Sequence, residues 1–366
     1  MKQKRITIAH VAQWRLHNQA LARPRFETAA DVVRWLGAVQ AQDFAAAKWA
    51  IGQRMIDGTD GRIERAFDEG AILRTHVLRP TWHFVLPEDI RWLIALTAPR
   101  VHAVNAYVYR RFGLDAATRR RSNAIIERAL RGRQYLARAA VVAKLRAARV
   151  ASDPIAIGTL LMAAELDALI CSGPLQGKRH TYALLEERVP PAPSITRDEA
   201  IARLTRRFFA SHGPATARDF CWWSGLLAKD VRLGLELTRS ALVSEVVEGE
   251  HYWRMPSTER PTPGRSRVHL LSNFDEYLVA YADRRAAYDV DCLAEKRPSR
   301  SPVFAHTVLI DGQIVATWQR SVARGAVAIV ITPIRGLGRA DRTAVRRVAE
   351  RYAAFLGTSP QVTYGA

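Results

Sequence analysis

The stretch AIGTLLMAAELDALICSGPLQGKRHTYALL, residues 156–185, decides the fold of this chain. Its apolar first half, Ala156–Ile170, predicts a helix, and residues 171–178 are rich in turn-forming side chains. Thr181–Leu185 then indicates a strand that returns after the turns. Residues 122–130 and 136–145, further upstream, also predict helices. Three helices followed by a short hairpin are the elements of a winged helix, a helix-turn-helix variant, so the sequence predicts such a unit here.

The same order of elements is predicted at the N-terminal end. Ile8–Leu21 has helical spacing, and Thr28 is typical of an N-cap, with Asp31 in the first helical turn. Residues 71–78 and 81–86 are rich in β-branched and aromatic side chains, which predicts two strands with Arg79-Pro80 between them. Helices followed by a two-stranded ribbon again indicate a winged helix.

A third unit is predicted after the proline-rich segment 190–193. Thr196 and Glu199 have the spacing of a capping box. Residues 212–214 interrupt the chain before a second helix, and residues 251–255 supply a wing strand. Three loosely similar units indicate a tandem array.

The last hundred residues have a different pattern. Residues 306–310 and 313–319 predict two strands joined by Asp311-Gly312, 326–333 predicts another strand, and 342–356 predicts a helix. The predicted fold class is therefore α+β, mostly α, with three tandem winged-helix units and a C-terminal β-containing cap. The predicted domains are 1–100, 101–192, 193–262 and 263–366.

Positive charge dominates the composition. The chain has 55 Lys+Arg against 35 Asp+Glu, a net charge of +20. Residues 100–149 carry 13 bases and only two acids, a net charge of +11. A surplus of this size favours a polyanionic partner, with nucleic acid first and an anionic membrane second. An arginine-biased genome explains why 48 of the bases are Arg, but it explains neither the surplus nor its clustering.

Several classes of protein are excluded by missing patterns. No apolar run reaches the ~18 residues of a membrane-spanning helix, and the N-terminus has no signal-peptide core. Cys171, Cys221 and Cys292 lie far apart without a CxxC motif, which indicates a reducing compartment and argues against a structural zinc or iron–sulfur site. Walker A, Rossmann and zinc-deaminase patterns are also absent. We therefore expect a cytoplasmic, nucleoid-associated protein without a metal or a cofactor.

The most unusual small motif is the pair Gln40 and Gln42. Two positions on a helix are separated by about 200° of rotation, so these side chains cannot share a helix face. They could converge at a helix end or in a turn. By itself, a Gln-x-Gln motif is usually made of ordinary surface or capping residues.

Two further clusters combine polar and aromatic residues. In residues 79–84, strand alternation places Thr81 and His83 on one side and Trp82 on the other, which fits either a buried tryptophan or the polar wall of a nucleic-acid pocket. Asp275 and Glu276 are adjacent in sequence, so their side chains are expected to diverge. This favours a structural tie between the C-terminal cap and a winged helix over paired-carboxylate glycoside chemistry. The run Arg284-Arg285 is expected to be a solvated face.

Six stretches, in a fixed order, carry a resemblance to a known family. They are LGAVQAQDFAAAKWAIGQR, RTHVLRPTWHFVLPEDIRWL, GTLLMAAELDALICSGPLQGKRHTYALLEERVP, HGPATARDFCWWSGL, FDEYLVAYADR and DGQIVATWQR. The chain resembles the AlkZ-like winged-helix family of bacterial DNA glycosylases over nearly its whole length. The resemblance implies three tandem winged helices with a concave DNA-binding surface. It also implies monofunctional excision of alkylated bases, including N7-alkylated purines and DNA interstrand crosslinks.

The resemblance also assigns candidate site residues. The family's catalytic signature is Gln-x-Gln or, in a second branch, Gln-x-Asp, and Gln40 and Gln42 match the first branch, which is linked to bulky toxin adducts and crosslinks. Asp43 is one position out of phase with the second form. Asp43, Thr81 and His83 are therefore expected in the cleft rather than in the catalytic pair.

The chemistry of glutamine agrees with this implication. A guanine alkylated at N7 is cationic and already a good leaving group, so little general-acid help is required. A glutamine amide can hold and orient a water molecule, but it is not a strong base near neutral pH. No lysine other than Lys48 lies near Gln40 in the sequence, so a Schiff-base lyase step is not indicated. Because a crosslinked base cannot be flipped fully out of the duplex, an open cleft is expected.

Double-stranded DNA with alkylated or crosslinked bases is the expected partner, bound by a monomer. The residues expected to contact phosphates are Arg79, Arg119, Arg120, Arg121, Lys178 and Arg179. Two alternatives are a non-catalytic winged-helix regulator of transcription and a self-resistance protein that binds a toxin or its adduct without excision. The regulator would bind specific sequences, and changes at Gln40 would affect no chemistry.

Overall fold

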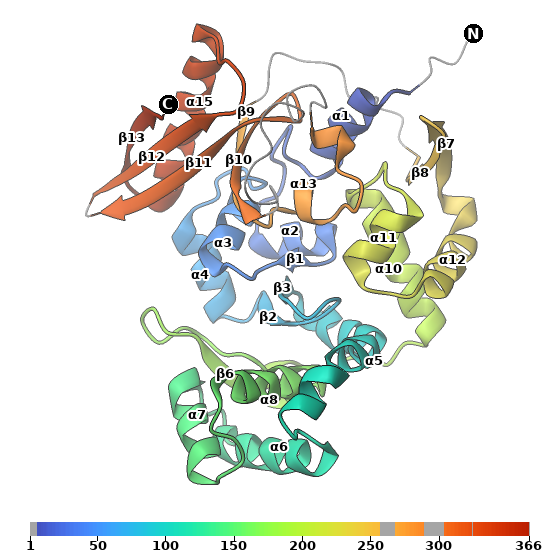
Figure 1. Cartoon of the computed structure of the whole chain (residues 1–366), viewed down its shortest axis with the longest axis vertical. Helices are drawn as coiled ribbons and strands as arrows, with labels where there is room; N and C mark the ends of the chain where they lie inside the picture. Colours follow the sequence, from blue (N-terminus) through green and yellow to red (C-terminus); the bar gives the residue numbers. More distant parts are fainter. Residues whose placement is uncertain (1–5, 257–267, 289–303, 324, 366) are drawn as a thin grey trace.

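The structure is a computed structural model that describes residues 6–256, 268–288, 304–323 and 325–365. It is a mixed α+β fold in which helices surround several small sheets (Figure 1). No helix in the described ranges is long and apolar enough to cross a membrane.

The first group of elements surrounds a three-stranded sheet with strand order β1-β3-β2. The group consists of α1 (Ile8–Asn18), α2 (Ala29–Leu36), β1 (Val39–Gln40), α3 (Phe44–Gly52), α4 (Asp60–Asp68), β2 (Leu73–His76) and β3 (Trp82–Val85). The Thr28 hydroxyl caps α2 by accepting from the Asp31 backbone N–H at 3.1 Å, as predicted. The two strands predicted on either side of Arg79-Pro80 are confirmed. The prediction that α1 continues to Leu21 is wrong, because Ala20 adopts a φ of 56°, which ends the helix.

The second group follows the long helix α5 (Pro87–Arg111), which the sequence reasoning did not anticipate. It consists of α6 (Ala116–Leu130), β4 (Leu136–Ala137), α7 (Arg138–Ala147), α8 (Pro154–Leu166), β5 (Ile170–Ser172), β6 (Thr181–Leu184) and α9 (Leu185–Arg188). The sheet order is β4-β6-β5. The helix predicted over 136–145 is displaced by two residues, because β4 occupies 136–137 and α7 covers Arg138–Ala147. The helix predicted over 156–170 extends too far, since α8 ends at Leu166 and Ala168 adopts a φ of 56°.

The third group contains α10 (Arg197–Ser211), α11 (Ala217–Ser224), α12 (Ala228–Leu237), η1 (Arg239–Ala241) and the hairpin of β7 (Val243–Val247) and β8 (Glu250–Arg254). The predicted capping box is present, because Thr196 and Glu199 satisfy each other's backbone N–H groups. The predicted boundary at residue 262 lies outside the described residues.

The C-terminal part is a five-stranded sheet of order β13-β12-β11-β10-β9 with one long helix. Its elements are β9 (Val268–Leu271), α13 (Glu276–Val279), η2 (Arg285–Ala287), β10 (His306–Ile310), β11 (Gln313–Ala323), β12 (Ala326–Pro333), α15 (Arg339–Leu356) and β13 (Ser359–Tyr364). The strands predicted at 306–310 and 326–333 are confirmed, as is the final helix. Strands β9 and β13 were not predicted.

Shared apolar cores fix how these groups sit together. One core joins the first group to the C-terminal sheet and includes Trp49, Trp318 and Tyr352. A second core joins α5 to the third group and to Tyr281. The second group, below the others in Figure 1, has a core of its own, and its Leu166, Cys171 and Leu185 also join the second core. The small sheet β1-β3-β2 of the first group therefore lies where the second group, the third group and the C-terminal part meet.

Candidate active site

Gln40 lies at the end of β1, and Gln42 lies in the three-residue link, residues 41–43, that leads into α3. Gln40 belongs to an extended strand and Gln42 lies in a bend, so the two residues are not on a helix. The helix geometry considered from the sequence therefore does not apply. Gln40 is buried, with 5% of its surface exposed, whereas Gln42 is exposed.

Contacts from two distant segments hold Gln40 in place. Its backbone N–H donates to Glu276 Oε1 at 2.7 Å, and its side-chain Oε1 accepts from Arg79 Nη2 at 2.7 Å. Both partners are charged, and hydrogen bonds to charged groups are stronger than neutral ones. The amide oxygen of Gln40 is therefore fixed, which leaves its NH₂ group as the end that can act on another molecule.

The sheet face that carries Gln40 is polar, and several of its side-chain atoms lack hydrogen-bond partners. Gln40 pairs with His83 across β1 and β3, and His83 pairs with Thr75 across β3 and β2. Three buried side-chain atoms here, Thr75 Oγ1, Thr81 Oγ1 and His83 Nε2, have no hydrogen-bond partner within the described protein. Most buried polar atoms in proteins are paired, so the unpaired ones beside Gln40 make this face a candidate functional site. Thr81 and His83 line none of the three cavities described below, and their place in a cleft stays a prediction.

His83 is held as a neutral ring. Its Nδ1 lies 2.9 Å from the Thr81 carbonyl oxygen, and the side chain is fully buried. Burial and then the positive charge of Arg79 lower the pKa of His83 to about 3. At neutral pH this ring therefore presents its second nitrogen without a positive charge.

Gln42 opens onto a cavity of about 450 Å³ between the first and second groups, here called the Gln42 cavity. Gln42 Oε1 accepts from the Trp82 backbone N–H at 3.4 Å. Arg74 braces the segment, because its Nε donates to the Ala41 carbonyl at 2.9 Å and its guanidinium lies 4.3 Å from the Trp82 ring centroid. The lining residues are Gln42, Asp43, Phe44, Arg74, Trp82, Arg138, Glu165, Ser172, His180, Thr181 and Tyr182.

Asp43 also lines this cavity, but its carboxylate has a structural task. It is the N-cap of α3 and accepts from the Ala46 backbone N–H at 3.0 Å. Glu165 is the other carboxylate of the cavity, buried and contacted by His76 and by Trp82 Nε1. The sequence reasoning did not single out Glu165 or Arg138.

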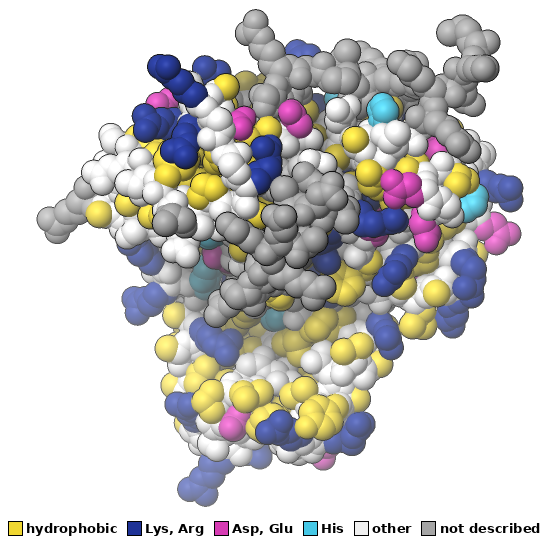
Figure 2. Space-filling view, turned by 45° about the horizontal axis from the view of Figure 1, so that its top comes forward, with side chains coloured by type: hydrophobic (Ala, Val, Ile, Leu, Met, Phe, Trp, Pro, Cys, Tyr) yellow, Lys and Arg dark blue, Asp and Glu magenta, His cyan; other side chains and the backbone are white. Residues whose placement is uncertain are grey.

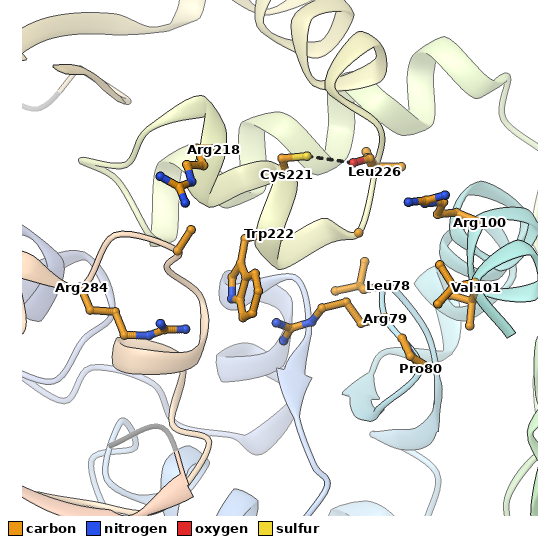
Figure 3. A pocket seen from close by; sticks show the side chains of 13 residues that line it. Leu78, Arg79, Pro80, Arg100, Val101, Arg218, Cys221, Trp222, Leu226 and Arg284 are labelled. Carbon is orange, nitrogen blue, oxygen red and sulfur yellow. Dashed lines mark hydrogen bonds between the residues drawn. The ribbon is translucent and has the colours of Figure 1, made fainter. Parts of the chain in front are cut away.

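A second cavity of about 480 Å³ lies on the other side of the Arg79-Pro80 turn and is here called the Trp222 cavity (Figure 3). A third cavity of about 380 Å³ shares Pro80 with the Trp222 cavity, and it shares Trp82 and Tyr182 with the Gln42 cavity. The three cavities therefore lie next to one another around the turn between β2 and β3, and together they are called the furrow here. The face in Figure 2 is hollowed in its middle, with basic side chains around the hollow.

The adjacent acids Asp275 and Glu276 diverge and tie the molecule together, as predicted. Asp275 accepts hydrogen bonds from Arg54 Nη2 at 2.8 Å and from Arg54 Nη1 at 2.9 Å. Glu276 accepts from the Gln40 N–H and, at 2.9 Å, from Trp223 Nε1 on α11. The side chains of Asp275 and Glu276 are both buried. Glu276 thus joins the C-terminal part to both the first and the third group at the candidate site.

The predicted phosphate-contacting residues fall in different places. Arg79 lines the Trp222 cavity, whereas the α6 residues Arg119, Arg120 and Arg121 line none of the three cavities. Arg120 and Arg121 are exposed, and Arg119 is half-buried over the Tyr109 ring. Lys178 and Arg179 are exposed in the loop between β5 and β6. Their contact with DNA stays a prediction.

The prediction that Arg284-Arg285 forms a solvated face is wrong for Arg284. Arg284 is half-buried, donates from Nε to the Leu278 carbonyl at 2.9 Å, and lines the Trp222 cavity. Arg285 is exposed and forms ion pairs with Asp283 and Glu248. Adjacent residues point to different sides here, because the 3₁₀ turn η2 begins between them. Arg100 belongs to the basic stretch 100–149, but neither it nor Arg218 was singled out from the sequence. Arg218 and Trp222 both lie in one of the stretches that carry the resemblance.

Comparison with known proteins places this chain in a family. A family model described as DNA glycosylase AlkZ-like matches residues 33–355. A curated protein of Streptomyces sahachiroi, named interstrand DNA cross-link repair glycosylase, is 24% identical over 95% of this chain and 96% of its own length. The solved structure of Streptomyces sahachiroi DNA glycosylase AlkZ superposes with a TM-score of 0.79 at 21% identity, covering 99% of this chain and 100% of that one. The chain described here therefore belongs to the AlkZ-like DNA glycosylase family.

Proposed function

We propose that this protein is a monofunctional DNA glycosylase that hydrolyses the N-glycosidic bond of N7-alkylated purines, including purines joined in an interstrand crosslink. The observation that carries the proposal is the fixed position of Gln40, held by Arg79 and Glu276 beside the unpaired polar atoms of Thr75, Thr81 and His83. Family membership and the crosslink-repair relative support the same activity.

The reaction follows from the charge of the lesion. The glycosidic bond breaks with its electron pair moving onto the purine N9, which neutralises the cationic base. The sugar becomes oxocarbenium-like, a water molecule adds to C1′, and its proton passes to solvent water. Gln42 and the NH₂ group of Gln40 would hold and orient the attacking water. Neutral glutamines suffice because the leaving group needs no protonation.

The charges of the Gln42 cavity suit a cationic base. Its lining carries two carboxylates, Asp43 and Glu165, against two guanidiniums, Arg74 and Arg138. Burial, followed by the charges of Arg74 and Lys48, lowers the pKa of His180 to about 4, so that ring adds no positive charge at neutral pH. A cationic purine therefore meets no net repulsion in this cavity.

The state of Lys48 supports hydrolysis without a lyase step. Its ammonium group donates to Asp60 at 2.7 Å and to Glu64 at 2.5 Å, and its side chain is 6% exposed. A lysine that attacks a sugar carbon must be uncharged and accessible. Lys48 is neither, so water is the proposed nucleophile.

The three helix-and-sheet groups are proposed to act as tandem winged helices that hold duplex DNA against the furrow as a monomer. The proposed domains are 1–100, 101–192, 193–262 and 263–366. An open furrow, unlike a closed pocket, accepts a base that is still attached to the opposite strand. Phosphate contacts from Arg120, Arg121, Lys178 and Arg179 would give affinity without sequence preference.

The test is base release from two duplexes, one methylated at guanine N7 and one carrying an N7-guanine crosslink. We expect the wild-type protein to release free base from both, and Gln40→Ala and Gln42→Ala to slow release by about 100-fold or more, a loss of about 2.7 kcal/mol of transition-state stabilisation. The absence of release from both duplexes, together with tight binding of one DNA sequence, would instead establish a regulator.

A further inference from the structure

The Trp222 cavity has the opposite electrostatic character to the Gln42 cavity. Four guanidiniums line it, those of Arg79, Arg100, Arg218 and Arg284, and no carboxylate does. Within the described ranges, none of the four forms an ion pair. Figure 3 shows Arg79, Arg218 and Arg284 arranged around Trp222, with Arg100 on the far side. Unpaired guanidiniums around one cavity form a binding site for an anion.

An aromatic side chain stands among these charges. Trp222 is 46% exposed, which is unusual for so large an apolar residue, and its Nε1 donates to the Val279 carbonyl at 2.9 Å. The Arg284 and Arg79 guanidinium carbons lie 5.5 and 5.8 Å from its ring centroid. The ring is thus fixed in place with surface left open, as in the stacking platforms that hold single bases.

Arg79 connects this cavity to the candidate catalytic residue. Its Nη2 donates to Gln40, and its Nε is buried without a partner in the described protein. Burial lowers the pKa of Arg79. A guanidinium that is largely withdrawn from water and short of one acceptor is suited to receive an oxygen from a ligand.

We propose that the Trp222 cavity holds one unstacked, undamaged nucleotide next to the lesion, with its base on Trp222 and its phosphate between Arg218 and Arg284. This inference rests on the proposed glycosylase function. The lesion itself does not belong here, because four guanidiniums repel a cationic purine, whereas the Gln42 cavity balances its charges. The volume of about 480 Å³ lies within the range of small-molecule sites, roughly 300–1,000 Å³.

This arrangement gives the cavity a role in the excision of bulky lesions. A crosslinked base cannot leave the helix, so the duplex must be opened beside it by moving a neighbouring nucleotide. Displacing the neighbouring nucleotide onto Trp222 would open the strand beside the lesion. The phosphate of that nucleotide would also place charge next to Arg79 and thus next to Gln40.

The experiment measures the dissociation constants of two duplexes of the same sequence at one salt concentration. One duplex is fully paired, and the other carries a single unpaired thymidine. We expect the wild-type protein to prefer the second duplex by about fivefold or more, the low end of what aromatic stacking of one base supplies. Trp222→Leu should abolish the preference, and Trp222→Phe, which keeps an aromatic ring, should retain most of it.

Arginine variants complete the test. Arg284→Gln should weaken binding of the unpaired duplex more than binding of the paired one, whereas Arg347→Gln, exposed on α15 and outside the cavities, should not alter the preference. Equal affinities in the wild type, or a preference that survives Trp222→Leu, would overturn the proposal. Equal weakening of both duplexes by Arg284→Gln, with no effect of Trp222→Leu, would show a backbone phosphate contact only and would also overturn it.

Base release measured on the same proteins separates this inference from the proposed function. Without base release, a preference that depends on Trp222 would refute the glycosylase activity and leave the nucleotide cavity standing. Base release that is unchanged in Trp222→Leu, together with equal affinities of the wild-type protein for the two duplexes, would support the glycosylase activity and refute the nucleotide cavity.

Discussion

Arg79 Nη2 donates to the side-chain oxygen of Gln40 at 2.7 Å and so connects the turn between β2 and β3 to the end of β1. The contact fixes which end of the Gln40 amide faces away from Arg79. It also joins the four-arginine Trp222 cavity to the proposed catalytic pair. The orientation of Gln40 is therefore expected to depend on a residue that need not touch the reacting atoms.

Loss of this contact should lower the rate more than substrate binding. Arg79→Gln removes a charged hydrogen bond, and such bonds contribute about 1.5–3 kcal/mol. We expect kcat for base release to fall about 10- to 100-fold, with a smaller change in KM. Arg100→Gln is the matched control, because it removes the same charge from the same cavity without a contact to Gln40. Equal effects of both variants on kcat would contradict a positioning role for Arg79.

The buried pair Arg54–Asp275 should be essential for stability. Both side chains are fully buried, and their two hydrogen bonds tie α3 to the C-terminal part. Arg54→Met leaves a buried carboxylate without its main partner, which typically costs 3–5 kcal/mol. Denaturant unfolding should show a loss of about that size, and the double variant Arg54→Met/Asp275→Leu should recover part of it. A double variant that is no more stable than the single one would contradict this view.

Stability should fall in acid with a contribution from His83. Its pKa is about 3 in the folded protein, against about 6.5 for an ordinary histidine. Between these values the unfolded chain binds a proton that the folded chain does not, so the free energy of unfolding rises with pH. The contribution is complete above about pH 6.5 and is lost as the pH falls towards 3, at about 1.4 kcal/mol per pH unit. His83→Gln should reduce the slope of unfolding free energy against pH by about one proton in this window, and an unchanged slope would refute the assignment.

Arginines on α6 should set the salt dependence of DNA binding. Arg120 and Arg121 are exposed and lie outside the furrow's lining. Each phosphate contact contributes about 0.9 to the slope of log K against log salt concentration. We expect Arg120→Gln/Arg121→Gln to reduce that slope by about 2 and to weaken binding of every sequence alike. A loss of affinity confined to one sequence would mean that these residues read bases.

The sequence predicted local structure better than it predicted the site. Strand and cap signals at Thr28, Thr196 and residues 306–310 depend on short-range hydrogen bonding and alternation, and they are confirmed. The role of Glu276 in joining the C-terminal part to a winged helix was also predicted, but its hydrogen bond to the Gln40 backbone N–H was not. That bond spans 236 residues, and only the packing of the C-terminal part against β1 creates it.

The cavities could not be predicted for the same reason. Arg79, Arg218 and Arg284 come from three separate segments, and in the sequence each is one arginine among 48. Arg284 was expected in solvent because a charge run gives no information on the indole that packs beside it. Gln40 and Gln42 stood out in the sequence as an unusual motif, but only the resemblance gave them a catalytic role, because the pairing of Gln40 with His83 depends on the folded sheet.

The catalytic role of Gln42 can be measured by single-turnover release of 7-methylguanine from a methylated duplex, compared between the wild-type protein and Gln42→Ala. We expect measurable release by the wild type and a rate lower by about 100-fold in the variant, with DNA binding retained. Equal rates in the two proteins would contradict the assignment of the site. No release by the wild type from this duplex or from a crosslinked one would contradict the glycosylase function itself.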